Sequence, residues 1–237
     1  MALAPRAVPV SEPPLTTRSL AVRRTARWSI LGELASGTTD VWIVLHGYGH
    51  LVAEFVAATK WPVAQGRAFV FPEALHRFYI EDASRPQPHS TAPVGASWMT
   101  REARADDIAD NHAYLNAVVN EIRTAAPRAT ITVLGFSQGG ATASRWAAER
   151  AAAGDPPSRL ILWGSILPPE LELAPSAPMR LVPTTLVIGV RDIWATPERV
   201  KAERDRLASA QFHATVRFFE GGHRMDDATL DQIASDV

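Results

Sequence analysis

The sequence predicts one α/β domain with a mostly parallel central sheet and helices on both faces. Two observations support this prediction: short, continuously apolar runs recur along the chain, and stretches with the apolar spacing of helices lie between them. Strands that are apolar throughout are typical of a sheet buried on both faces. Strands that alternate with helices predict right-handed crossovers, which place neighbouring strands parallel.

Six apolar runs are predicted to form the sheet. They are residues 41–45, 68–71, 131–134, 160–163, 186–190 and 214–219. Two more stretches, 18–24 and 27–34, are predicted to be strands that extend one edge, with antiparallel pairing as one option. Glycine, proline or polar residues follow most of these runs, as expected at strand ends.

Four helices are expected between and after these strands, at 101–126, 137–153, 197–210 and 226–237. The first is the clearest, because its apolar residues repeat at spacings of three and four and form one stripe. Thr100 is a candidate N-cap for this helix, and Pro127 marks its end.

The length of 237 residues leaves one domain or two small ones open, and no linker divides the chain. We therefore predict a flexible N-terminal segment at 1–17 and a single domain at 18–237. The connections 73–100 and 165–183 are longer than usual, and such loops are often functional. The second is rich in proline, which favours an ordered, extended path. It is also too short for a large cap domain.

Composition excludes several classes of function. Lys and Arg total 24 against 25 Asp and Glu, and this balance disfavours a nucleic-acid-binding protein. No apolar run approaches the roughly 18–20 residues that span a bilayer, so integral membrane association is not expected. The absence of cysteine excludes disulfides, thiolate metal sites and a cysteine nucleophile.

The N-terminus is rich in arginine and proline but has no apolar segment of the secretory type. We therefore predict a cytoplasmic protein, and a targeting leader is the less favoured alternative. The expected state is a monomer or a homodimer.

Residues 135–139 read Gly-Phe-Ser-Gln-Gly and match the pattern G-x-S-x-G. A β-branched strand precedes this motif and an alanine-rich helix follows it, which is the setting of a nucleophile elbow. The glycines permit a tight turn that exposes Ser137 at the positive end of the helix. An ordinary glycine-rich turn is the alternative, and a P-loop is excluded because no lysine follows Gly140. We interpret Ser137 as a nucleophile.

An elbow serine needs an acid and a base, in the chain order Ser, Asp or Glu, His. Functional groups of parallel sheets lie beyond the carboxyl ends of the strands. Asp192 follows the predicted strand 186–190, and His223 follows the strand 214–219 through a Gly-Gly turn. The other histidines weighed fit less well by order or position: His76, His89, His112 and His213. Taken alone, Asp192 could be a capping or turn residue and His223 a loop residue.

The oxyanion of an acyl-transfer intermediate needs two aimed N–H groups. We predict that one is the backbone N–H of Gln138, directly after the nucleophile. The other is predicted to be that of Tyr48, in the Gly-Tyr-Gly loop after the strand 41–45. A generic loop at the end of this strand is the alternative.

Substrate-pocket residues are predicted from apolar side chains in segments that leave the carboxyl edge of the sheet. These are Tyr79, Trp98, Leu167 and Trp194. Core packing is the alternative for each of them.

From about residue 40 onward, the sequence resembles the phospholipase/carboxylesterase family of α/β-hydrolases, which includes acyl-protein thioesterase-like serine esterases. The resemblance rests on Leu-His-Gly-Tyr-Gly at 45–49, Gly-Phe-Ser-Gln-Gly-Gly at 135–140 and Gly-Gly-His at 221–223. Asp192, which follows Gly-Val-Arg at 189–191, completes the set. His50 stands where many members have aspartate. The resemblance implies an α/β-hydrolase fold and hydrolysis of esters or thioesters without a metal or cofactor.

We therefore predict a serine hydrolase that cleaves small-molecule carboxylic esters of short to medium acyl chain. Ser137 would attack the acyl carbon, His223 would accept its proton, and Asp192 would hold the imidazole in the required tautomer. An acyl thioesterase or lysophospholipase acting on longer chains is one alternative. A non-catalytic ligand-binding protein on the same scaffold is another.

Overall fold

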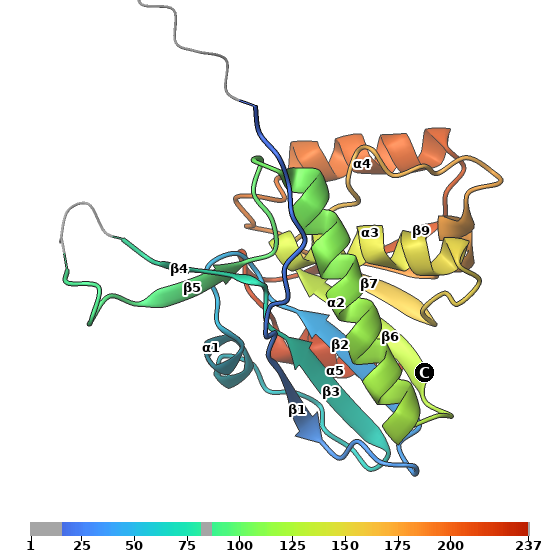
Figure 1. Cartoon of the computed structure of the whole chain (residues 1–237). Coiled ribbons are helices and arrows are strands. Elements are labelled where there is room, and N and C mark those ends of the chain that lie inside the picture. Colours follow the sequence, from blue (N-terminus) through green and yellow to red (C-terminus); the bar gives the residue numbers. More distant parts are fainter. Residues whose placement is uncertain (1–15, 82–86, 237) are drawn as a thin grey trace, which may run out of the picture.

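The computed structural model describes residues 16–81 and 87–236, and its centre is a seven-stranded sheet in the order β1-β3-β2-β6-β7-β8-β9 (Figure 1). The strands are β1 (Trp28–Gly32), β2 (Asp40–Leu45), β3 (Arg67–Pro72), β6 (Thr130–Phe136), β7 (Arg159–Trp163), β8 (Thr184–Gly189) and β9 (Ala214–Phe219). Only β1 pairs antiparallel, with β3; the other neighbours are parallel. The predicted fold class is confirmed.

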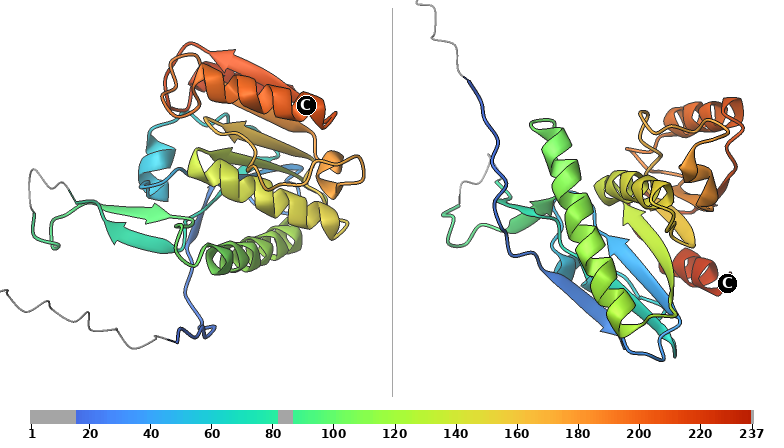
Figure 2. Two further views of the ribbon diagram at one scale, coloured as in Figure 1. Left: turned by 90° about the horizontal axis from the view of Figure 1, so that it is seen from above. Right: turned by 45° about the vertical axis from the view of Figure 1, so that its right-hand side comes forward.

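Helices cover both faces of this sheet (Figures 1 and 2). They are α1 (Val52–Ala57), α2 (Arg104–Ala125), α3 (Gln138–Ala152), α4 (Pro197–Ser209) and α5 (Asp227–Ser235). On β2, Val41, Ile43 and Leu45 pack in the core under α2 and α3, whereas Trp42 and Val44 pack in the core under α1 and α5. This two-sided burial is why the strands are apolar throughout.

The structure differs from the predicted elements at the N-terminus. Residues 18–24 form no strand, and most of their side chains are exposed, so the antiparallel edge consists of β1 alone. Its large apolar side chains, Leu20 and Val22, remain exposed, so the stretch gains no burial that would hold it on the sheet. The flexible segment predicted at 1–17 lies outside the described residues except for its last two.

The connection 73–100 contains a hairpin that the sequence analysis did not predict. Strands β4 (His76–Tyr79) and β5 (Val94–Ser97) form a separate two-stranded antiparallel sheet that projects from the body (Figure 1). Each has only four residues, which is too short for a clear apolar alternation. The short helix α1 was missed for the same reason. In the proline-rich connection 165–183, a single 3₁₀ turn, η1 (Pro178–Leu181), interrupts the extended path.

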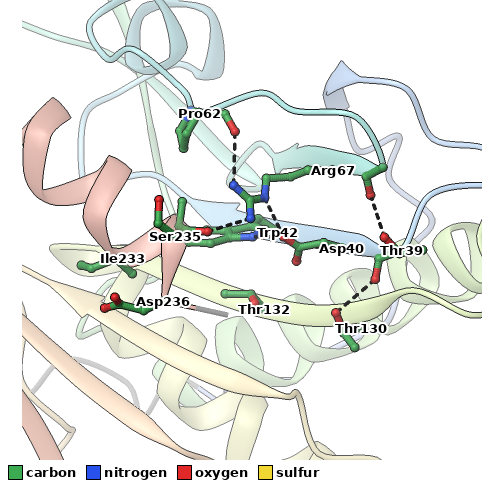
Figure 3. Close-up of polar contacts among 12 residues, drawn as sticks. Thr39, Asp40, Trp42, Pro62, Arg67, Thr130, Thr132, Ile233, Ser235 and Asp236 are labelled. Carbon is green, nitrogen blue, oxygen red and sulfur yellow. Dashed lines mark hydrogen bonds and ion pairs between the residues drawn. The ribbon is translucent and has the colours of Figure 1, made fainter.

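A polar cluster ties the C-terminal helix to the amino ends of the strands (Figure 3). Arg67 donates from Nε to Asp40 Oδ2 at 2.6 Å and from Nη2 to the carbonyl oxygen of Ala234 at 2.7 Å. The Arg159 guanidinium lies 4.8 Å from the centre of the Trp42 ring, close enough for a cation–π contact. This cluster occupies the opposite end of the sheet from Ser137, which lies at the carboxyl ends. Among the described residues, no helix is long and apolar enough to cross a bilayer.

Candidate active site

Ser137 lies in a tight turn between β6 and α3. Its φ of 53° and ψ of −118° are strained for a residue with a side chain. The surrounding glycines make this turn possible, because a Cβ on Gly135 would lie 2.5 Å from the Gly139 carbonyl oxygen. A Cβ on Gly139 would lie 2.3 Å from the carbonyl oxygen of Leu45. The elbow geometry therefore depends on close backbone approach between β2, β6 and α3.

The structure brings the three residues predicted as a triad into one hydrogen-bonded chain. The Ser137 hydroxyl lies 2.8 Å from Nε2 of His223, and Nδ1 of His223 lies 2.7 Å from Oδ2 of Asp192. The second carboxylate oxygen of Asp192 accepts the backbone N–H groups of Trp194 at 2.8 Å and Ala195 at 2.9 Å. Asp192 is 4% exposed. Its carboxylate is therefore fully paired and held in one orientation.

This arrangement can perform nucleophilic acyl chemistry. An imidazole that donates from Nδ1 to a carboxylate has Nε2 free to accept a proton, and here that nitrogen faces the Ser137 hydroxyl. The carboxylate also stabilises the imidazolium that forms when the serine attacks. The ring of Phe136 lies 4.9 Å from that of His223 and limits its movement.

Gly164, directly after β7, supports this chain of hydrogen bonds and was missed by the sequence analysis. Its φ is +57°, and a Cβ there would lie 2.9 Å from Cε1 of His223 and 3.2 Å from Oδ2 of Asp192. Only a residue without a side chain leaves room for the imidazole and the carboxylate. The sequence signal was a glycine at the carboxyl end of a central strand.

Substituting Gly164 by alanine should therefore lower kcat strongly, while the unfolding free energy should fall only by the cost of backbone strain. The methyl group must push the His223 ring or the Asp192 carboxylate aside, and a misplacement of about 1 Å can cost on the order of 10² in rate. Gly154→Ala is a matched control, because its φ is also positive, at +80°, with no atom within 4 Å of the added Cβ. Both variants should lose about 1–2 kcal/mol of unfolding free energy from backbone strain.

Only Gly164→Ala should lose kcat. Urea unfolding and steady-state ester hydrolysis of both variants measure the two quantities. Equal activity losses in the two glycine variants would contradict the steric explanation.

The backbone N–H groups of Tyr48 and Gln138, predicted as oxyanion donors, differ from those of neighbouring residues in their hydrogen bonding. Gln138 begins α3, and the first N–H groups of a helix have no acceptor within it. In the loop after β2, Gly49 donates to the Ala96 carbonyl at 2.9 Å, and His50 donates to Gly47. Within residues 16–81 and 87–236, the Tyr48 N–H has no backbone acceptor. Both N–H groups are thus available to a ligand oxygen.

His46 holds the start of this loop. Its Nδ1 lies 2.8 Å from the Gly47 carbonyl oxygen, and its Nε2 accepts the Ala74 N–H at 3.1 Å. Burial lowers the pKa of His46 from its ordinary value to about 4, although its hydrogen bond to the Gly47 carbonyl opposes the shift. The ring is therefore neutral at pH 7, donates from Nδ1 and accepts at Nε2.

Trp98 was predicted as a pocket residue, and this prediction is wrong. Its side chain is 0% exposed, and its indole Nε1 donates to the His46 carbonyl oxygen at 2.8 Å. Its backbone N–H donates to Oε1 of Gln138 at 2.9 Å, while Nε2 of Gln138 donates to the Met99 carbonyl at 2.8 Å. Trp98 and the Gln138 side chain therefore join the elbow to the loop after β2, residues 46–50, which bears the predicted Tyr48 donor and is called the oxyanion loop below.

Tyr79 does not line the cavity beside Ser137 either. It lies on β4, where its ring stacks on His89 at 4.4 Å. Instead, the hairpin contacts the oxyanion loop through Phe78, whose ring stacks on Tyr48 at 5.1 Å. Phe78 and Trp98 thus contact the oxyanion loop, and neither they nor Tyr79 line the cavity.

Leu167 and Trp194 do line this cavity, which Ser137 also lines and which has a volume of about 300 Å³. Most of its other walls come from the connection after β7 and from α3 and α4. These residues are Ala141, Arg145, Gly164, Ser165, Ile166, Pro168, Pro169, Ala195 and Arg199. Sequence reasoning missed the two arginines, because neither lies at the end of a strand.

His50, which stands where many members of the resembled family have aspartate, lies near the site. Its ring stacks between Phe55, at 5.7 Å, and Phe136, at 5.9 Å. Burial lowers its pKa, and the charge of His223 acts in the same direction while Glu54 opposes it. Within the described ranges, no three His, Asp or Glu side chains are grouped as metal ligands.

Comparison with solved structures shows the same fold in several esterases. The acyl-protein thioesterase 2 of Zea mays is 19% identical over 88% of this chain and 96% of its own, with a TM-score of 0.61. The Bacillus cereus carboxylesterase is 13% identical over 88% and 91% of the two chains, also with a TM-score of 0.61. A phospholipase/carboxylesterase from Dyadobacter fermentans is 16% identical over 90% and 96%, with a TM-score of 0.57.

No protein of curated function matches the sequence significantly. The fold predicted from the resemblance, an α/β-hydrolase fold, is confirmed by the sheet topology and these neighbours. Residues 41–228, which run from β2 into α5 and include the Ser137 elbow, match the family described as Serine hydrolase (FSH1). This chain therefore belongs to the FSH1 serine hydrolase family.

Proposed function

We propose that this protein is a carboxylesterase that hydrolyses esters of short to medium acyl chain through an acyl-enzyme on Ser137. The observation that carries the proposal is the hydrogen-bonded chain Ser137–His223–Asp192, whose serine lines a cavity. The cavity of about 300 Å³ is at the small end of the range for ligand sites, which favours short acyl groups.

In the proposed reaction, Oγ of Ser137 attacks the acyl carbon while Nε2 of His223 takes the hydroxyl proton. The N–H groups of Tyr48 and Gln138 stabilise the tetrahedral oxyanion. His223 then returns its proton to the departing alcohol. Water attacks the acyl-enzyme with the same histidine as base, which releases the acid and restores Ser137.

A second candidate is an acyl thioesterase or lysophospholipase that accepts longer chains. The observation that favours it is the apolar rim beside Asp192, where Ile193 is 74% and Trp194 62% exposed. A long chain that exceeds the cavity could continue across these two side chains.

The cytoplasmic location, the monomeric or homodimeric state and the domain limits 18–237 remain predictions.

The proposed function is tested by active-site labelling together with substrate turnover. A fluorophosphonate probe should modify Ser137, identified by mass spectrometry of the labelled peptide. Hydrolysis of p-nitrophenyl esters from acetate to dodecanoate should peak at short to medium length and exceed that of matched acyl thioesters. A maximum at long acyl thioesters would favour the second candidate. A protein that binds esters, turns none over and is not labelled would be a non-catalytic binder.

A further inference from the structure

The cavity beside Ser137 contains positive charge that ester hydrolysis does not require. Arg145 on α3 and Arg199 on α4 both line it, and no Asp or Glu is among the described lining residues. The remaining walls are mostly apolar, including Ile166, Leu167 and Pro168. A pocket for a purely hydrocarbon acyl chain would gain nothing from two guanidinium groups, because burying charge beside hydrocarbon is unfavourable.

The charges of the lining residues and their ion-pair partners are not balanced. Glu170 accepts a hydrogen bond from Nε of Arg145 at 2.8 Å and from Nη2 of Arg104 at 2.8 Å, so one carboxylate faces two guanidinium groups. Arg199 donates to the carbonyl oxygen of Trp194 at 2.7 Å and has no carboxylate partner within the described residues. These groups therefore carry an excess of positive charge, which would attract an anion into the cavity.

Arg145 is spaced from the nucleophile by a length that a short chain can bridge, and Arg199 lines the same cavity. Ala141 and Arg145 follow Ser137 at successive spacings of four residues, so they share one face of α3. The rise of the helix places the Cα of Arg145 about 12 Å along its axis from Ser137. Between these points the apolar wall of the cavity would contact a few methylene groups.

We propose that the acyl group of the substrate ends in a carboxylate, so that the substrate is a half ester of a dicarboxylic acid. This inference rests on the proposed function. We assign the acyl group of the substrate, and not its alcohol, to the cavity. Only the acyl group stays bonded to Ser137 while water attacks the acyl-enzyme. Arg199 pairs with the distal carboxylate, since guanidinium groups match carboxylates in charge and geometry. Arg145, which lines the same cavity, is bonded to Glu170 and adds positive charge.

The reaction is balanced without a further reactant. Oγ of Ser137 forms the new ester bond, and the alcohol leaves with the proton that His223 took from the serine. Water then breaks the serine ester bond and supplies one proton and one hydroxyl. The products are the alcohol and a dicarboxylate, and one proton is released to solvent at neutral pH.

The test compares three ethyl esters at constant ionic strength by pH-stat titration: monoethyl adipate, its terminal amide and ethyl hexanoate. These share the same acyl carbon count and differ in the charge and polarity of the far end. We expect kcat/KM for the half ester to exceed that for the amide at least tenfold, and the ratio to fall as salt is added. A ratio near one, with the neutral esters hydrolysed, would overturn this inference and leave the proposed function standing.

Arg199→Met should bring this ratio close to one, and Arg199→Lys should restore part of it. The ratio is decisive because the Arg199 contact with Trp194 also positions the loop that bears Asp192, and loosening that loop would slow all three esters alike. Arg204→Met, on the same helix but outside the lining of this cavity, is the matched control and should keep the wild-type ratio. A wild-type ratio in Arg199→Met would overturn the assignment. Failure to hydrolyse any of the esters or to take up the fluorophosphonate probe would instead refute the proposed function.

Discussion

Ser137→Ala is expected to lower kcat for ester hydrolysis by about five to six orders of magnitude. The hydroxyl lies 2.8 Å from Nε2 of His223, and no other group at the elbow can form the acyl-enzyme. Loss of the nucleophile from such a triad removes nearly all of the rate that the triad provides, on the order of 10⁶. Only catalysis by the oxyanion N–H groups and by binding should remain.

The measurement is single-turnover and steady-state hydrolysis of a short p-nitrophenyl ester, with thermal unfolding to confirm that the variant is folded. Ser209→Ala is the control, because Ser209 is an exposed residue of α4 whose hydroxyl, among the described residues, bonds only to the Asp205 carbonyl. This variant should keep wild-type kcat. Residual activity of Ser137→Ala above about one hundredth of wild type would contradict the assignment of the nucleophile.

Asp192→Asn is expected to lower kcat by about 10⁴ while leaving the fold intact. The asparagine Oδ1 can still accept the N–H groups of Trp194 and Ala195, so the loop keeps its anchor. Its amide would face Nδ1 of His223 as a donor and force the proton onto Nε2. The histidine could then no longer accept a proton from Ser137.

Asp226→Asn provides a matched control for this charge loss. Asp226 is the N-cap of α5, three residues after His223, and its side chain accepts the Thr229 N–H at 3.2 Å. Asparagine caps helices about as well as aspartate does, so stability and kcat should change little. If Asp192→Asn retained more than a tenth of wild-type kcat, the proposed role of the carboxylate would be wrong.

Local patterns in the sequence were sufficient for the elements that carry the site. The apolar runs of β2, β6, β7 and β8 could be predicted because strands buried on both faces need apolar side chains at most positions. The edge strand β9 is only partly buried, and its apolar residues were still sufficient to predict it. The rule that functional groups follow the carboxyl ends of such strands then selected Asp192 and His223. In the structure, His223 hydrogen-bonds to Asp192 through Nδ1 and to the Ser137 hydroxyl through Nε2.

Short elements and side-chain surroundings could not be predicted in this way. The β4–β5 hairpin pairs strands of four residues and contacts the oxyanion loop through the stacked rings of Phe78 and Tyr48, which are distant in sequence. An aromatic residue in a loop can be a core residue or a pocket wall. The fully buried position of Trp98 follows from contacts with His46 and Gln138, which are distant in sequence.

The sequence by itself determined the fold class, the elbow and the order of the three candidate catalytic residues, because each depends on local periodicity or on position relative to a strand. Only the tertiary structure decided the shape and charge of the cavity. Arg145 and Arg199 lie 54 positions apart on different helices, and their excess charge depends on how Glu170 is shared between Arg104 and Arg145. The charge balance of the cavity depends on distances between side chains that are remote in sequence, and the periodicity of the sequence carries no information about those distances.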